Sequence, residues 1–224
     1  MYAVTLSWDD GFRASSAKIA EIYEKFGLRA DFNIVASFHL KNTAESGPVF
    51  GDFGWWNELQ ARGHFIHPHG LDHSNKAQLP LAEAQEKIRA CLEIFGRELD
   101  GFDPARAVFA FPYNQSTPQV ESWLAGEVCA FRTDGSAIQP FPAAGQARLT
   151  TTGREDAEAC LEECLVELFD RPECWLLYTV HGLDGEGWGP LRSAYLERVL
   201  GSLLERQDVR VLPTLDVLGA APRP

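Results

Sequence analysis

Two short stretches of the sequence carry residue types that hold metal ions in proteins. The first is the pair Asp9 and Asp10, which follows a short apolar run over residues 3–6 and precedes Gly11. Two adjacent carboxylates at the end of a buried strand are costly to leave without a partner, and the glycine lets the chain turn sharply. The second stretch, residues 67–73, reads His-Pro-His-Gly-Leu-Asp-His. Imidazoles and carboxylates together form zinc-type sites, so we interpret the two stretches as halves of one metal site.

The spacing within these stretches assigns each residue a role. His69 and His73 are four residues apart, so on a helical turn both rings can face one point, with Asp10 as the expected third ligand. Asp9 is then the free neighbour that accepts a proton from water. Adjacent residues on a strand point to opposite sides, so this division of the two carboxylates requires a turn directly after them. The alternative is a polar loop that caps the next helix. His67 is expected to be structural, because a site of this kind keeps one position open.

The hydrophobic pattern predicts alternating strands and helices. Strands are expected over residues 3–6, 30–37, 64–66, 107–111, 128–132, 148–152, 174–180 and 209–212. Helices are expected over residues 15–26, 55–62, 79–96, 118–124, 154–169 and 191–206. The strand at 148–152 is weak, because its Thr run suits a loop equally well, and residues 38–53 are predicted to be a loop. The connections are long enough for right-handed crossovers, which indicates parallel strands.

This alternation fits either an open doubly wound sheet or a closed barrel. The sequence has no fingerprint of the G-x-G-x-x-G or P-loop type that would favour a nucleotide-binding sheet. The candidate reactive residues instead follow at least four different strands, as they do on the catalytic rim of a barrel. We therefore predict an α/β barrel. No repeat, linker or low-complexity stretch interrupts the pattern, so residues 1–224 are expected to form a single domain.

Composition limits the partners of the protein. The 224 residues are 45% apolar and 23% charged, which is ordinary for a globular protein. A net charge of −12 argues against nucleic acid or an anionic membrane surface as the main partner. No apolar run approaches the roughly 20 residues needed to span a bilayer, and no signal peptide precedes the first strand. The expected location is cytoplasmic, or secreted if a signal has been trimmed, and the oligomeric state is left open.

The cysteines indicate no disulfide framework. There are five, an odd number, and none falls in a Cys-x-x-Cys pair. Cys160 and Cys164 lie one helical turn apart, a spacing that suits a metal but is more typical of buried apolar filling. We expect all five to be reduced thiols.

Four motifs resemble those of a known family. Residues 5–11 (Thr-Leu-Ser-Trp-Asp-Asp-Gly) are similar to the first motif of the NodB-homology polysaccharide deacetylases, carbohydrate esterase family four. Residues 63–73 resemble the second, metal-binding motif of that family. Residues 111–114 (Phe-Pro-Tyr-Asn) are similar to the end of the third motif, and residues 177–181 (Leu-Tyr-Thr-Val-His) to the last. The motifs occur in the family order and cover nearly the whole chain.

The resemblance implies a distorted (β/α)7 barrel with a divalent metal, most often Zn2+, with Co2+, Ni2+ or Mn2+ as alternatives. Carried onto this chain, the metal ligands are Asp10, His69 and His73. The implied substrate is an N-acetylated saccharide, and the implied reaction is hydrolysis of its acetamide.

The resemblance also implies the catalytic groups. Asp9 is the general base, His181 is the general acid, and the backbone N–H of Tyr113 joins the metal in stabilising the oxyanion. The scheme is chemically coherent, because a fixed N–H stabilises a tetrahedral oxyanion. An acid is also required, since an amide nitrogen is a poor leaving group until it is protonated.

Two positions depart from the family pattern. The third motif normally carries an Arg two residues before its Pro, where it orients the base, and this sequence has Ala110 there. Arg132, after the following strand, is the candidate replacement, with a surface Arg as the alternative reading. The Asp that partners the acid His in the family has no unambiguous counterpart. Asp134 is the best-placed candidate and Asp184, near His181, is the second.

Aromatic side chains that could stack on a sugar ring are Trp55, Trp56, Trp188, Tyr113 and Phe111. Trp188 lies on the loop after His181, so it is expected to wall the site. Phe111 and Asn114 are also expected at the substrate. Trp55 and Trp56 are equally consistent with the core, which is the commoner place for tryptophan.

These features support three functional hypotheses. The first is metal-dependent removal of an acetyl group from an N-acetylated amino sugar or oligosaccharide. The second is hydrolysis of another C–N bond or an acetyl ester in a small, non-polymeric substrate, which the cytoplasmic expectation and the missing Arg favour. The third is a carbohydrate-binding homologue with weakened or no catalysis. The complete set of acid, base and metal ligands argues against the third.

Overall fold

The computed structural model describes residues 1–42 and 49–219. Its strands are β1 (Tyr2–Trp8), β2 (Asp31–Ile34), β3 (Phe65–Pro68), β4 (Val108–Ala110), β5 (Ala130–Asp134), β6 (Ile138–Pro140), β7 (Arg148–Thr151), β8 (Cys174–Val180) and β9 (Val209–Val211). Its helices are α1 (Arg13–Lys25), α2 (Phe53–Ala61), α3 (Leu81–Glu98), α4 (Pro118–Leu124), α5 (Ala157–Phe169), α6 (Ser193–Leu204) and α7 (Thr214–Val217).

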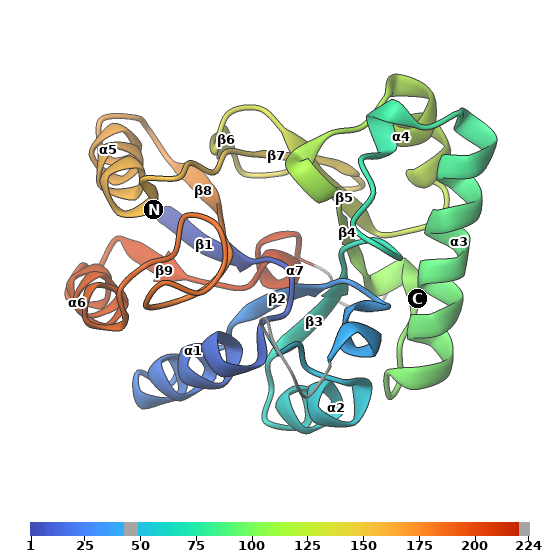
Figure 1. The fold of residues 1–224 in the computed structure, drawn as a ribbon. Coiled ribbons are helices and arrows are strands. Elements are labelled where there is room, and N and C mark those ends of the chain that lie inside the picture. Colours follow the sequence, from blue (N-terminus) through green and yellow to red (C-terminus); the bar gives the residue numbers. More distant parts are fainter. Residues whose placement is uncertain (43–48, 220–224) are drawn as a thin grey trace.

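Parallel strands form a ring, and the helices lie around its outside (Figure 1). β1 pairs with β2 on one side and with β8 on the other, and β2 pairs with β3. β4, β5 and β7 form a second parallel ladder, and a bridge from Thr152 to Tyr178 joins its last strand to β8. β3 lies beside β4 without a ladder within the described ranges, so the ring has a seam there. The predicted α/β fold of parallel strands and surrounding helices is confirmed, and the seam is its main distortion.

Buried polar side chains lie at this seam. The N–H of Val108, on β4, donates to Nδ1 of His67, on β3, at 3.5 Å. Nε2 of His67 lies 3.1 Å from one carboxylate oxygen of Asp31, on β2. The other carboxylate oxygen of Asp31 accepts hydrogen bonds from the backbone N–H and the hydroxyl of Thr214, at the start of α7. His67 therefore contacts both sides of the seam, in a structural position.

Side chains alternate between the barrel interior and the helices, as the pleat of a strand requires. The outward-facing set of β1 packs in the large core against the helices: Val4, Leu6 and Trp8. The inward-facing set alternates with it: Ala3, Thr5, Ser7 and Asp9. At one end of the interior, Ala3 packs with apolar residues of β4, β5, β7 and β8. At the other end the interior is polar, and Asp9 lies there, at the carboxyl end of its strand.

The structure adds two elements that the hydrophobic pattern did not predict. β6 runs antiparallel on β8, where Ile138 pairs with Leu176. With three residues, one of them Pro140, β6 is too short to give a periodic signal, and its proline suits only an edge position. α7 is one turn of four residues, which is also below the length that periodicity detects.

Other predictions concern the connections, the thiols and the membrane. The weak strand expected over residues 148–152 is present as β7. The loop expected over residues 38–53 contains a 3-10 turn, η1 (Phe38–Lys41), while residues 43–48 lie outside the described part of the chain. All five cysteines lie within the described residues, and none of them forms a disulfide there. Among the described residues, no helix combines the length and apolar character that crossing a membrane requires.

Thr214→Val tests the contacts that reach Asp31. The substitution keeps the shape of a buried side chain but removes the hydroxyl that donates to the carboxylate. A buried carboxylate with one hydrogen bond fewer is less stable, so we expect the free energy of unfolding to fall by about 1–3 kcal/mol. Urea denaturation at pH 7 measures this change. Thr152→Val is the control, since no hydrogen bond of the Thr152 hydroxyl is present among the described residues. Equal losses in the two variants would contradict the prediction.

Candidate active site

The turn after β1 places two adjacent carboxylates in different surroundings. Asp9 continues the inward-facing register of the strand, whereas Asp10 has a left-handed backbone with φ of 73° and Gly11 follows with φ of 84°. A Cβ on Gly11 would lie 3.0 Å from the Trp56 ring and 3.1 Å from Ile34. Both the backbone conformation and the available space therefore require glycine at this position. The turn directs Asp10 away from the line of the strand, which separates the two carboxylates.

Asp10, His69 and His73 come together at the carboxyl ends of β1 and β3. Oδ1 of Asp10 lies 3.3 Å from Nε2 of His73 and 3.6 Å from Nε2 of His69. One ligand atom from each of the three side chains lies within 4.8 Å of the others. The connection between the two histidines is not the helical turn that their spacing suggested. It is irregular, with left-handed backbone at Gly70 (φ 85°) and His73 (φ 60°).

These three side chains fit a divalent cation. Nδ1–H of His69 donates to the carbonyl oxygen of Ala110 at 2.9 Å, which leaves the Nε2 lone pair on the side of Asp10. Oδ1 of Asp10 is buried and has no hydrogen-bond partner within the described residues. A buried carboxylate oxygen without a donor is costly unless a cation lies beside it. One carboxylate and two imidazoles suit zinc, and they also suit other first-row divalent metals.

Electrostatics keep both histidines ready to bind a cation. Burial lowers the pKa of His69 to about 3 and the pKa of His73 to about 4, so both rings are neutral at pH 7. Burial, together with the neighbouring charge of Asp9, raises the pKa of Asp10 to about 7. A cation among the three side chains favours the charged carboxylate. Binding of a cation there would therefore be coupled to release of the Asp10 proton.

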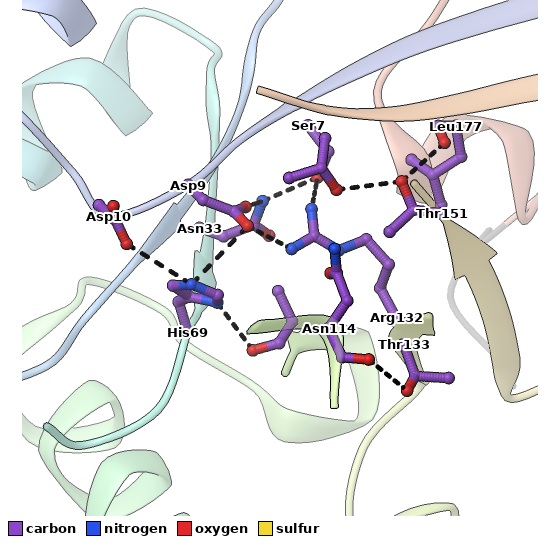
Figure 2. A network of polar contacts seen from close by, with 12 residues as sticks. Ser7, Asp9, Asp10, Asn33, His69, Asn114, Arg132, Thr133, Thr151 and Leu177 are labelled. Carbon is purple, nitrogen blue, oxygen red and sulfur yellow. Dashed lines mark hydrogen bonds and ion pairs between the residues drawn. The ribbon is translucent and has the colours of Figure 1, made fainter. Parts of the chain in front are cut away.

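Asp9 is enclosed by donors on both of its oxygens (Figure 2). Oδ1 accepts from Nδ2 of Asn33 at 2.9 Å, and Oδ2 accepts from Nη2 of Arg132 at 2.5 Å. Nε2 of His69 lies 3.7 Å from Oδ2. Burial acts to raise the pKa of Asp9, but the positive charge of Arg132 and its hydrogen bond, with His69, hold that pKa below the usual value. The carboxylate is therefore charged at neutral pH, although it is only 3% exposed.

Ser7 and Asn33 support this ion pair, and sequence reasoning missed both. Oγ of Ser7 accepts from Nη1 of Arg132 at 2.8 Å and from Nδ2 of Asn33 at 2.8 Å. It therefore fixes both of the groups that donate to Asp9. A signal was available, because each residue is a polar side chain next to apolar residues of a predicted strand, and a buried polar group requires a partner.

Arg132 reaches Asp9 from the strand next to Ala110. The two residues are direct neighbours in the register of β4 and β5. Because the alanine side chain is small, the guanidinium of the adjacent strand has room to cross the interior. The expectation that Arg132 replaces the missing Arg agrees with this arrangement.

Asn114 was expected at the substrate. Its side-chain Oδ1 is buried and has no hydrogen-bond partner within the described residues.

His181 follows β8 and lies against Trp188. The two rings are perpendicular, with centroids 5.4 Å apart and an interplanar angle of 89°. Burial lowers the pKa of His181, while the charge of Asp9 and a hydrogen bond with the Trp188 backbone oppose that effect. Trp188 is 50% exposed, so part of its side chain remains accessible to a ligand.

Neither carboxylate that the sequence offered as a partner of His181 contacts it. Asp184 accepts from the backbone N–H of Ser193 at 2.8 Å and from its hydroxyl, so it caps the start of α6. Asp134 is exposed at the end of β5 and forms no hydrogen bond or ion pair with His181 among the described residues. Asp184 lies close to His181 in the sequence, but this closeness does not determine which way its side chain points.

Of the aromatic candidates, Tyr113 joins Trp188 near the site and Phe111 does not. Phe111 is fully buried and packs against Phe109 and Phe131, so the prediction that it contacts substrate is wrong. It occupies the outward-facing register of its strand and belongs to the core against the helices. Tyr113 has a left-handed backbone (φ 59°), is 60% exposed, and its ring centroid lies 4.7 Å from that of His73.

The two tryptophans of α2 belong to the core. Trp56 is 1% exposed and its indole N–H donates to the carbonyl oxygen of Gly51 at 2.9 Å. Trp55 packs against Trp56, and the guanidinium of Arg13 lies over its ring. Of the aromatic residues that the sequence offered, Trp188 and Tyr113 therefore remain as candidates for stacking on a sugar.

Comparison with known proteins finds similarity in structure. The sequence matches no protein-family model and no curated protein. A solved structure from Mycobacterium smegmatis, provisionally described as a polysaccharide deacetylase, aligns with a TM-score of 0.74 over 100% of this chain and 94% of its own, at 12% identity. The Bc1960 peptidoglycan N-acetylglucosamine deacetylase aligns with a TM-score of 0.69 over 100% of this chain and 95% of its own, at 14% identity.

This chain has the fold of the polysaccharide deacetylases. The resemblance that the four motifs indicated is confirmed at the level of the fold. The same fold carries other hydrolytic chemistry, since Puue allantoinase aligns with a TM-score of 0.72 over 100% of this chain and 92% of its own, at 13% identity. A fold shared at such low identity leaves the reaction to be argued from the residues of the site.

Zinc is expected to stabilise the protein, and more strongly at higher pH. Without a cation, the pKa of Asp10 is about 7 in the folded protein. This value lies above the value of about 3.9 in an unfolded chain. The folded state then holds an extra proton between these two values, so it loses stability as the pH rises through this range. A bound cation removes that loss. We expect zinc, compared with a chelator, to raise the Tm more at pH 8 than at pH 5.5.

Asp10→Asn is the matched variant for this test. It keeps the shape of the side chain and removes both its charge and its titration. We expect zinc to raise the Tm of this variant by less than that of the wild type, and by no more at pH 8 than at pH 5.5. If this variant and the wild type gain equally from zinc at both pH values, the assignment of Asp10 as a ligand is wrong.

Proposed function

We propose that this protein is a metal-dependent hydrolase that removes the acetyl group from an N-acetylated amino sugar or oligosaccharide. The observation that carries the proposal is that the two adjacent carboxylates lie in different surroundings. Asp9 is kept charged by Arg132, and Asp10 faces two neutral histidines. A base beside a cation site is the arrangement that hydrolysis of an unactivated amide requires.

The base is prepared by its neighbours. Arg132 and Asn33 bind one oxygen of Asp9 each, so the carboxylate is oriented as well as charged. In the proposed reaction, Asp9 accepts a proton from the attacking water. A divalent cation held by Asp10, His69 and His73 would supply Lewis acidity, polarising the acetamide carbonyl and making the water more acidic.

Protonation of the leaving group is assigned to His181, and stabilisation of the oxyanion to Tyr113. His181 gives a proton to the departing nitrogen, and because burial lowers its pKa, its protonated form is a stronger acid than an ordinary imidazolium. The backbone N–H of Tyr113 is proposed to stabilise the oxyanion as a fixed donor. Asn114 and the rings of Trp188 and Tyr113 are proposed to contact the sugar, since the two exposed rings lie against the two histidines.

A second candidate is hydrolysis of a C–N bond in a small cyclic or acyclic amide. The similarity of the fold to an allantoinase favours it. The two candidates make the same use of Asp9 and the metal ligands and differ in the substrate. A panel of N-acetylglucosamine oligomers, small amides and acetyl esters separates them, because release of acetate from the oligomers at the highest kcat/KM is expected only of the first.

Asp9→Asn tests the assigned base. The amide has nearly the same shape but cannot accept the proton, so we expect kcat to fall by about 10²–10⁴-fold with the best substrate of the panel. Zinc content, measured on the purified protein, should remain unchanged because Asp9 is not a proposed ligand. Asp170→Asn, at the exposed end of α5, is the control and should retain full activity. Full activity in Asp9→Asn would refute the proposed mechanism.

Arg132→Gln tests how the base is kept charged. The guanidinium holds the pKa of Asp9 down, so its removal raises that pKa. A base with a higher pKa is protonated over more of the acidic range. We therefore expect the acidic limb of the kcat/KM profile to move to higher pH, together with a lower maximum. A profile whose acidic limb stays in place would show that Arg132 does not set the charge of Asp9.

A further inference from the structure

The loop between β8 and α6 carries two groups of the proposed site, His181 and Trp188. One end of this loop is held by Asp184, which binds the first residue of α6. The middle of the loop is held by a different element. Oε2 of Glu186 accepts hydrogen bonds from the backbone N–H of Ser15, at 2.9 Å, and from its hydroxyl. The side chain of Glu186 thus reaches the first turn of α1.

The hydroxyl of Ser15 completes a closed set of contacts. It donates to Glu186 and accepts from the backbone N–H of Leu183 at 2.9 Å. The backbone N–H of Glu186 in turn donates to the carbonyl oxygen of Leu183 at 3.0 Å. One buried serine therefore contacts the loop at two points, through one side chain and one backbone group.

The first turn of α1 favours contact with the carboxylate of Glu186. The residue before the helix, Phe12, provides no side-chain hydrogen bond to its first turn, and that turn contains no acidic residue. The N–H groups of a helix start lack partners within the helix and attract negative charge. Glu186 supplies both an acceptor and a charge from 171 residues away in the sequence.

The loop is also packed tightly on the start of α1. A Cβ on Gly182 would lie 2.9 Å from Oγ of Ser15 and 2.3 Å from the carbonyl oxygen of Glu186. A Cβ on Gly187 would lie 2.7 Å from the ring of Phe12. No side chain fits between the two segments at these points, so the loop has little freedom to shift relative to the helix.

We propose that Glu186 and Ser15 form a clamp that sets the position of His181 relative to Asp9. Ser15 is joined to the Asp9–Asp10 turn by four intervening residues, and Glu186 follows His181 at a similar distance in the sequence. The clamp therefore connects the chain segment that carries His181, the proposed acid, to the segment that carries Asp9, the proposed base. Glu186 is thus a positioning residue that acts through His181 and Trp188. This inference rests on the proposed function for the role of His181, but the clamp itself does not.

Two substrates with different leaving groups test this role. An acetamide needs a positioned acid to protonate its nitrogen, whereas an aryl acetate releases a stable phenolate without one. We expect Glu186→Gln and Ser15→Ala each to lower kcat for the amide by about 10-fold or more, and kcat for the aryl acetate by less than about 3-fold. The double variant should lose less than the product of the two single losses, since both substitutions weaken the hydrogen bond between the Ser15 hydroxyl and Glu186.

Glu93→Gln is the matched control. It makes the same change at an exposed position of α3 and should leave both activities and the Tm unchanged. A variant that merely loses folded protein lowers both activities by the same factor. Equal losses on the two substrates, or no loss on either, would therefore overturn the positioning role.

A spectroscopic measurement tests the clamp without catalysis. The ring of Trp188 stands perpendicular to that of His181, so its ring current acts on the histidine ring protons. We expect Glu186→Gln to move the NMR signals of these protons while those of His39 stay in place. Unchanged His181 signals would overturn the proposal. If the wild type hydrolyses no substrate of the panel, the proposed function fails, and these signals still decide whether Glu186 positions His181.

Discussion

Asp9 and Arg132 form an ion pair inside the barrel, and the arrangement of the site depends on it. Both side chains are almost fully buried, at 3% and 1% exposure. A buried carboxylate without a partner would take up a proton, and breaking such a pair typically costs about 3–5 kcal/mol. Ser7 and Asn33 complete the hydrogen bonds of the pair. These contacts let a charged carboxylate exist inside the barrel.

The same ion pair explains how two neighbouring carboxylates acquire different properties. Asp9 has its cation within the chain, and its pKa is held low. Asp10, turned away by the backbone before Gly11, lies beside two neutral imidazoles, and its pKa is raised to about 7 by burial and by the charge of Asp9. Two titratable groups whose pKa values are driven apart in this way support the proposed division into a base and a ligand. In this arrangement, the place left for a cation is next to Asp10.

Local patterns in the sequence determined much of this protein. Hydrophobic periodicity predicted the alternation of strands and helices, because burial on one or both faces of an element controls which residues it contains. The four motifs indicated the barrel fold, which the structure confirms. The spacing of Asp10, His69 and His73 selected three residues whose ligand atoms do meet. The roles of these residues, and the single domain and cytoplasmic location expected from composition, stay predictions.

Only the tertiary structure decided which side chains face one another. Strand register turns Phe111 into the core and brings Arg132 next to Ala110, so that an arginine from a neighbouring strand reaches Asp9. Asn33 lies 24 residues from Asp9, and Glu186 lies 171 residues from the helix start that it binds, so no local pattern contains either contact. The hydrophobic pattern of a sequence indicates which positions along a helix or strand are buried. The direction of a side chain, and its partner across the barrel, are set by strand pairing and by turns with a left-handed backbone.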